Sequence, residues 1–357
     1  MIKKIVKTGM VTALSFSLFT SPTFDNSILA AGNGPYVNEN QEIKIERLTS
    51  YEKMKSFLEK ADRKAEHISV EVIGQSVKGR DLHLVKFGSS EDKPTILMLT
   101  QQHGNEPLLT ESAFQVIQQL STNSREVKDL MEQVNILFVP RLNPDGAEGD
   151  VDWDTSHILG GGQQTRNNAN GINLNRTHNS LSQPETRALH EEVLQQYDID
   201  YAIDFHHQVA NRVIDDEGKE QLVSAAMLYP TSNVTEEVLE KSKQLGAVVH
   251  AAIEEKGYST MAKYHMGDTL TSNARNNLAT RYDIPTLLFE NRGLSASPNT
   301  DSILGQKSSG YLIGQGKVAM MSAIKAIADG SIDSADPGIW ESLPLQYTSG
   351  GEVEEGE

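Results

Sequence analysis

The chain has 357 residues, enough for one large domain or two ordinary ones, and 38% of them are hydrophobic, as in soluble globular proteins. Its formal net charge of −17 argues against nucleic acid or an anionic membrane as a partner. Cysteine is absent, which excludes disulfides, thiol catalysis and thiolate metal ligands. Any metal site must therefore consist of His, Asp and Glu.

Residues 1–31 have the pattern of an export signal. "MIKKIVK" is a basic segment, and "TGMVTALSFSLF" is a roughly 12-residue apolar segment, too short to span a bilayer. Small residues follow, with a cleavage point near Ala31, and an uncleaved anchor is the alternative. We therefore expect a bacterial protein that is secreted to the extracellular space and has no membrane attachment once the leader is removed.

Strand-like and helix-like segments alternate through the rest of the chain, without an internal repeat. Segments 68–77 and 81–88 predict a hairpin around Gly79, because β-branched and polar residues alternate on either side. Thr49 and Ser182 each stand three residues before a Glu and predict caps for the first and third helices. Five apolar runs predict strands buried on both faces: 95–101, 135–142, 201–207, 225–230 and 286–292. Helical periodicity predicts helices over 51–65, 107–121, 183–197, 233–256 and 311–328.

This alternation predicts an α/β fold with one domain over 43–335, in which helices cover both faces of a mixed, mostly parallel twisted sheet. Residues 346–357 are acidic and are expected to form a disordered tail. Ligands bind beyond the carboxyl ends of the strands in such sheets. Four predicted strands end in, or are followed by, a polar residue: His103, Asn143, His206 and Glu290.

His103 and Glu106 lie on the turn after segment 95–101. With His206 from a distant strand end, they supply two imidazoles and a carboxylate, a set that catalytic zinc accepts together with a water molecule. The H-x-x-E spacing alone is a weak signal, and His206 could instead be a strand-end histidine bonded to backbone. His207 is the alternative ligand, because neighbouring strand residues point to opposite faces and only one of the two can face a metal.

A longer set of motifs resembles the M14 zinc carboxypeptidases in order and spacing, from about residue 45 to 330. The motifs are "IGQSVKGRDLHLVKFG", "QQHGNEP", "RLNPDGAE", "GINLNR" followed by "PET", "DFHH" and "PTLLFENR". The resemblance implies one zinc ion per chain, bound by His103, Glu106 and His206. The family's Asp-x-His pattern at Asp204 favours His206 over His207.

The same resemblance implies the catalytic groups and the activity. Glu290 is the implied general base for a zinc-bound water. Arg166 matches the arginine that stabilises the oxyanion, and Asn175 and Arg176 match the pair that binds the terminal carboxylate of the substrate. The alternatives are a solvated loop arginine at 166 and a glutamate paired with Arg292 at 290. The implied activity is hydrolysis of the C-terminal peptide bond of peptides or proteins, by an enzyme that we expect to be a monomer.

One position departs from the family pattern. The family commonly has Asp where this chain has Asn173, and that carboxylate orients a zinc-binding imidazole. An amide oxygen also accepts the imidazole N–H, but it carries no charge and raises the basicity of the ring less. We therefore predict weaker zinc binding than in a protein with Asp.

Two substrate-binding positions are less sharply defined by sequence. Tyr264 is the candidate for the family's flexible tyrosine that covers the substrate, ahead of Tyr258 and Tyr282. Arg275 falls near the floor of the family's side-chain pocket, where it would favour acidic C-terminal residues. The alternative for Arg275 is a surface arginine on a loop. Five histidines have no partner at a motif spacing and are expected to be ordinary surface or core residues: His157, His178, His190, His250 and His265. His207 is expected to be a rim or substrate contact.

Two other functions are compatible with these motifs. One is an amidase of the same fold that acts on cell-wall peptides, and it would use the same zinc and base. The other is an inactive peptide-binding module, against which the retention of all three ligands, the base and both arginines argues.

Overall fold

The computed structural model describes most of the chain after its first 47 residues. No helix in this part is long and apolar enough to cross a membrane. The predicted leader, residues 1–31, lies outside it. The described residues belong to one compact unit and comprise 48–88, 90, 92–155, 164–257, 260–292 and 306–349, with the side chains of 306–309 left out.

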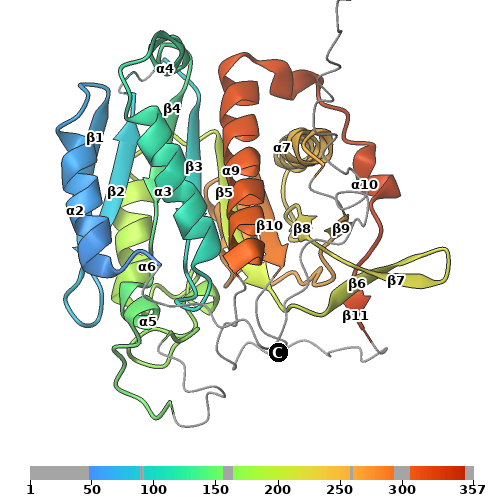
Figure 1. Cartoon of the computed structure of the whole chain (residues 1–357), viewed down its shortest axis with the longest axis horizontal. Helices are drawn as coiled ribbons and strands as arrows, with labels where there is room; N and C mark the ends of the chain where they lie inside the picture. Colours follow the sequence, from blue (N-terminus) through green and yellow to red (C-terminus); the bar gives the residue numbers. More distant parts are fainter. Residues whose placement is uncertain are drawn as a thin grey trace, which may run out of the picture. The chain divides into compact units, whose positions relative to one another are not determined.

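A mixed eight-stranded sheet, in the order β1-β2-β4-β3-β5-β10-β8-β9, forms the centre (Figure 1). The four strands from β4 to β10 in this order run parallel, as β8 and β9 do, and the remaining pairs are antiparallel. The predicted hairpin and the five predicted buried strands are confirmed. The strands are β1 (Ile68–Gln75), β2 (Asp81–Phe87), β3 (Thr95–Thr100), β4 (Asn135–Val139), β5 (Tyr201–Gln208), β8 (Ala225–Leu228), β9 (Met261–Lys263) and β10 (Thr286–Arg292).

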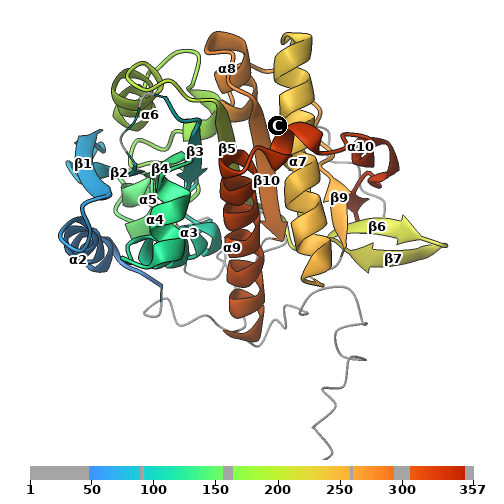
Figure 2. The ribbon, with the colours of Figure 1, turned by 90° about the horizontal axis from the view of Figure 1, so that it is seen from above.

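Helices cover both faces of this sheet (Figure 2). Long helices α2 (Tyr51–Asp62), α3 (Leu108–Leu120), α7 (Glu236–Glu255) and α9 (Gln306–Ala328) pack on one face, and α6 (Pro184–Leu189) and α8 (Ala274–Arg281) pack on the other. Strand β3 shows why the strands are apolar throughout. Ile96 and Met98 lie in the core on the α3 side, while Leu97 and Leu99 lie in the core on the α6 side.

Several short elements have no counterpart in the sequence prediction. They are α4 (Arg125–Met131), α5 (Pro144–Glu148), η2 (Leu174–Arg176), η4 (Ser331–Ser334) and α10 (Ile339–Ser342), together with α8. The helix predicted over 183–197 comprises α6 and the π-helical segment η3 (His190–Leu194) that follows it. The predicted caps are also wrong by one residue. Ser50 caps α2 by accepting from the backbone N–H of Lys53, whereas Thr49 bonds to the carboxylate of Glu111. Gln183, and not Ser182, is the N-cap residue of α6, and its side chain makes no capping hydrogen bond.

The predicted tail does not begin at residue 346. Tyr347–Thr348 form β11, which pairs with β6 (Arg212–Asp216). Strand β6 continues into β7 (Lys219–Leu222), and this hairpin projects from the molecule in both ribbon views (Figures 1 and 2). Backbone pairing with β6 therefore orders the chain as far as β11, and residues 350–357 lie outside the described part.

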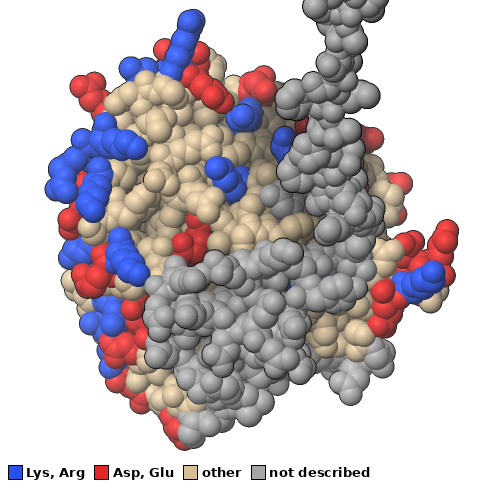
Figure 3. All heavy atoms as spheres, in the orientation of Figure 1, with Lys and Arg blue, Asp and Glu red and all other residues tan. Residues whose placement is uncertain are grey.

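Charge is distributed over the rim of the face that Figure 3 shows. Basic and acidic side chains are interspersed there, and uncharged residues occupy much of the uncovered area between them. The tip of the β6–β7 hairpin is itself charged, with Asp216, Lys219 and Glu220 exposed.

Candidate metal centre and active site

Adjacent strands bring His103, Glu106 and His206 together. His103 and Glu106 lie on the turn after β3, and His206 lies near the end of β5, which pairs with β3. Glu106 Oε1 is 2.8 Å from His103 Nδ1, and Glu106 Oε2 is 2.9 Å from His206 Nδ1. The two Nδ1 atoms are 3.0 Å apart. All three side chains are buried, and they are the one group of three metal-ligating side chains found among the described residues.

The outer nitrogens of both imidazoles have oxygen partners. His103 Nε2 lies 3.0 Å from Asn173 Oδ1, and His206 Nε2 lies 3.0 Å from Asp204 Oδ1. Such partners are typical of metal-ligating histidines, because a hydrogen bond from Nε2 leaves the lone pair of Nδ1 free for the metal. Ligands at about 2.0–2.1 Å from a tetrahedral zinc ion are about 3.3 Å apart. The observed separations are slightly shorter, so small side-chain shifts would fit zinc at this position.

The pKa values of the two histidines shift in opposite directions in the absence of a metal. Although burial opposes the change, the carboxylates of Asp204 and Glu106 raise the pKa of His206 well above its usual value, and a bound cation would displace the proton from its Nδ1. Burial, with help from Arg166, lowers the pKa of His103 to about 4, so this imidazole is neutral at physiological pH. Burial by itself would raise the pKa of Glu106, but the two histidines hold it well below its usual value. His207 is not part of the group. Its backbone N–H donates to Glu106 Oε2 at 3.1 Å, and its buried Nε2 has no hydrogen-bond partner.

Glu290 lies beside His206, because the two residues are register partners in the parallel pair β5–β10. Its side chain is buried, and its Oε2 makes no hydrogen bond. Burial raises the pKa of Glu290 to about 8. The guanidinium Nε of Arg292 donates to the carbonyl of Ala210. Glu290 thus has a carboxylate oxygen available for a ligand or a water molecule.

Two further predicted residues contact the same group, and a third lies next to one of them in the sequence. Arg166 donates from Nη1 to Glu106 Oε1 at 2.8 Å, and its side chain is 29% exposed. Asn175 Oδ1 accepts from the backbone N–H of Ala274, which places its amide nitrogen 3.3 Å from His206 Nε2. Arg176 is partly exposed and donates to the carbonyl of Asn175 at 2.8 Å. The structure therefore brings Arg166 and Asn175 into contact with the histidine–glutamate group, and Arg176 follows Asn175 in η2.

Arg275 is buried in α8 and does not lie on an exposed loop. It is 3% exposed, and it donates to Thr231 Oγ1 at 3.0 Å and to the carbonyls of Met266 and Asp268. Its nearest carboxylate oxygen, on Asp268, is 3.8 Å away. Burial lowers the pKa of Arg275, and the charge of Glu290 is among the influences that oppose this change.

Tyr264 interacts electrostatically with two of the predicted catalytic groups, Glu290 and Arg166. Its Oη lies 3.7 Å from the sulfur of Met266. Burial, followed by the charge of Glu290, raises the pKa of its phenol. Tyr282 instead bonds to His190, and Tyr258 lies outside the described residues.

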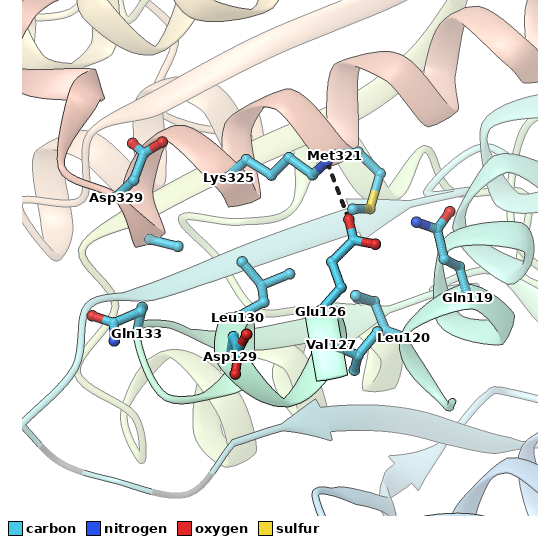
Figure 4. A pocket seen from close by; sticks show the side chains of 11 residues that line it. Gln119, Leu120, Glu126, Val127, Asp129, Leu130, Gln133, Met321, Lys325 and Asp329 are labelled. Carbon is cyan, nitrogen blue, oxygen red and sulfur yellow. Dashed lines mark ion pairs between the residues drawn. The ribbon is translucent and has the colours of Figure 1, made fainter. Parts of the chain in front are cut away.

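A separate cavity of about 450 Å³ lies between α3, α4 and α9 (Figure 4). Its apolar lining includes Leu130 and Met321, and an ion pair of 3.7 Å joins Glu126 and Lys325 at its edge. None of its lining residues belongs to the histidine–glutamate group.

A family model described as zinc carboxypeptidase matches residues 54–290. The chain belongs to the zinc carboxypeptidase family. This membership agrees with the motifs, and it makes the His103–Glu106–His206 group the natural place for the family's zinc. No ion is present in the structure, so the fit rests on the donor atoms and on the oxygen partners of the two outer nitrogens.

The curated relatives of this chain are longer than the chain itself. Carboxypeptidase D of Mus musculus is 30% identical over 199 residues, which are 52% of this chain and 14% of the mouse protein. Carboxypeptidase 2 of Trichophyton tonsurans is 26% identical over 245 residues, 66% of this chain and 41% of the fungal protein. The chain thus spans less than half the length of either relative.

Solved structures share the fold. A metallo-carboxypeptidase from Burkholderia cenocepacia has a TM-score of 0.58 at 20% identity, covering 78% of this chain and 69% of that one. Carboxypeptidase A from Helicoverpa armigera has a TM-score of 0.58 at 16% identity, covering 84% of this chain and 80% of that one. The mixed α/β sheet predicted from the sequence is therefore the fold of known carboxypeptidases.

Proposed function

We propose that this chain is a secreted zinc carboxypeptidase that removes residues one at a time from the C-termini of peptides. The observation that carries the proposal is the convergence of His103 Nδ1, His206 Nδ1 and the carboxylate of Glu106 within 4.8 Å, beside the buried Glu290. His103, Glu106 and His206 are the proposed metal ligands. Zinc bound there would act as a Lewis acid and lower the pKa of a bound water toward about 7.

Glu290 is the proposed general base. Its Oε2 is free to accept a proton from the attacking water and later to deliver it to the leaving amine. Burial raises the pKa of Glu290 to about 8 in the metal-free site. A bound dication would lower this pKa toward neutral pH, where a carboxylate can both accept and return a proton. The partly exposed guanidinium of Arg166 is accessible to a substrate, and its proposed role is to stabilise the developing oxyanion.

Asn175 and Arg176 are the proposed receptors for the C-terminal carboxylate. Arginine's planar fork suits two parallel hydrogen bonds to a carboxylate, and an adjacent amide adds a further donor. Both residues lie on η2, and the contact of Asn175 with His206 would hold a terminal carboxylate close to the proposed zinc site. Tyr264 is proposed to cover the bound substrate.

Arg275 is the proposed specificity residue. A buried arginine is costly without a carboxylate partner, and the carboxylate of Asp268 is 3.8 Å away. A substrate side chain that ends in a carboxylate would improve this pairing. We therefore propose a preference for acidic C-terminal residues.

The pattern of residues 1–31 supports export. N-terminal sequencing of protein recovered from the culture medium of an expressing bacterium tests this point, and cleavage close to Ala31 is expected. Protein that stays with the cells at full length would contradict export.

Mass spectrometry of a mixed peptide pool tests the activity. The mature protein is incubated with the pool as prepared, with a chelator, and with chelator followed by zinc. Chelator-sensitive ladders shortened singly from the C-terminus are expected. If the peptide pool is untouched but cell-wall peptides are cleaved, the chain is instead an amidase of the same fold. If neither the peptide pool nor the cell-wall peptides are cleaved, the chain is a peptide-binding module without activity.

A further inference from the structure

A continuous line of hydrogen bonds runs through the sheet face that carries α6 and α8 (Figure 2). It starts at Tyr282, just after α8, and passes through His190, His178 and Gln102 to Asp204. The four distances are 2.8 Å from Tyr282 Oη to His190 Nδ1, 3.0 Å from His190 Nε2 to His178 Nδ1, 2.7 Å from His178 Nε2 to Gln102 Oε1, and 2.7 Å from Gln102 Nε2 to Asp204 Oδ1.

The direction of donation follows from chemistry at the Asp204 end. A carboxylate only accepts hydrogen bonds, so the group of Gln102 that faces Asp204 is its NH₂, and its carbonyl oxygen faces His178. His178 Nε2 must therefore carry a proton. Because His178 is fully buried and burial lowers its pKa well below the usual value, the ring is neutral and its Nδ1 accepts.

The same reasoning extends outward to the protein surface. His190 donates from Nε2 to His178, and since burial lowers the pKa of His190 to about 4, its Nδ1 accepts from the phenol of Tyr282. Every donor in the line thus points toward Asp204. Hydrogen bonds aligned in one direction polarise one another and strengthen the final acceptor contact.

Asp204 in turn determines the state of His206. Three polar atoms surround His206 Nε2: Asp204 Oδ1 at 3.0 Å, and the amide nitrogens of Gln102 and Asn175, each at 3.3 Å. Both amide nitrogens are donors, so the carboxylate is the one acceptor available for an N–H at this position. With a metal bound, a proton held on Nε2 would leave the lone pair of Nδ1 directed at the position between Glu106 and His103.

We propose that His178 is a positioning residue for the zinc site, acting through Gln102 and Asp204 to hold His206 in the tautomer and orientation that ligation requires. His178 touches neither the predicted ligands nor the place of a substrate. Its effect comes from fixing the amide of Gln102, which would otherwise be free to turn its oxygen toward Asp204 and repel it. The inference rests on the proposed role of His206 as a zinc ligand.

Zinc affinity of the folded protein tests this inference without a measurement of activity. Affinity is measured by competition with a chelator, and the unfolding midpoint of each metal-free variant is recorded beside it. His178→Leu removes the donor to Gln102 and is expected to weaken zinc binding by about tenfold, the lower end of the range for outer partners of metal ligands. His178→Gln places an amide N–H where the imidazole N–H was and is expected to bind zinc within about threefold of the parent.

His83→Leu is the matched control, since His83 is also a buried histidine but lies in β2 outside the line. It is expected to change stability and to leave zinc affinity unaltered. The cobalt-substituted proteins provide a second readout, and a changed visible spectrum is expected for His178→Leu alone, because the geometry around His206 is altered.

Two outcomes would overturn the inference. If His178→Leu loses stability but binds zinc like the parent, His178 is a structural core residue. If His178→Gln loses as much affinity as His178→Leu, the N–H donor is not what matters. A parent protein that binds no zinc would instead refute the proposed function, and this inference with it.

Discussion

The carboxylate of Asp204 lies 3.0 Å from Nε2 of His206, on the side of the ring away from Glu106. The other imidazole of the pair, His103, has the neutral amide oxygen of Asn173 at the same distance. The two histidines therefore have unequal partners, one charged and one uncharged. A charged partner increases the basicity of an imidazole more than an amide does, so His206 should be the stronger ligand of the two.

Asn173→Asp tests the contribution of His103, the histidine with the uncharged partner. We predict tighter zinc binding, by up to about tenfold, because the new carboxylate would accept the Nε2 proton of His103 with full charge. Competition with a chelator measures the change, and Asn170→Asp, on an exposed position of the same loop, controls for added charge nearby. Unchanged or weaker affinity in Asn173→Asp would show that this amide does not limit zinc binding.

Glu290→Gln separates chemistry from metal binding. We predict a fall in kcat of about 10²–10⁴-fold, because the variant cannot accept the proton of the attacking water. Zinc content should remain one per chain, since Glu290 is not among the three proposed ligands. Steady-state kinetics with metal analysis of the same sample decides the point, and turnover close to that of the parent would exclude Glu290 as the base.

Arg275→Gln tests specificity while keeping N–H donors for Thr231 and the neighbouring carbonyls. We predict that the preference for peptides ending in Glu over those ending in Phe falls by about 10–100-fold in kcat/KM, the range for loss of a hydrogen bond to a charged group. Cleavage of the Phe peptide should change little. An unaltered ratio of the two kcat/KM values would assign Arg275 a structural role.

The lowered pKa of His190 predicts that the stability of the metal-free protein depends on pH. Its pKa is about 4 in the folded state and about 6.5 when unfolded, so between these values the unfolded chain binds a proton that the folded protein does not. The free energy of unfolding should therefore fall as the pH falls through this window, by up to about 1.4 kcal/mol per pH unit. His190→Gln should lose this part of the acid sensitivity. Urea unfolding at about pH 7 and about pH 5 measures it, and equal sensitivity in parent and variant would contradict the neutral, buried state.

The sequence predicts the sheet well, because each buried strand is a short run of apolar residues that can be recognised without knowing its neighbours in the fold. The predicted site residues also come together, since His103, His206 and Glu290 lie at the carboxyl ends of neighbouring parallel strands. Features that depend on distant partners were missed. Strand β11 forms only because β6 lies beside it, and nothing local marks Tyr347–Thr348 as a strand.

The line from Tyr282 to Asp204 could not be predicted for the same reason. His178 pairs with Gln102, 76 residues earlier, and His190 pairs with Tyr282, 92 residues later. Neither spacing resembles a motif, so the sequence predicts both histidines only as ordinary surface or core residues. The burial of Arg275 could not be predicted from the sequence either, because its partners Thr231 and Asp268 lie on separate loops.

The most direct test of the central claim uses two peptides of the same sequence, one with a free C-terminal carboxylate and one with a C-terminal amide. Rates of release of the last residue by the zinc-loaded protein are compared. The proposed receptors Asn175 and Arg176 predict that the amidated peptide is cleaved about 10–100-fold more slowly, because hydrogen bonds to a charged carboxylate are lost. Equal rates for the two peptides would show that the enzyme does not recognise a free C-terminus, and would contradict its assignment as a carboxypeptidase.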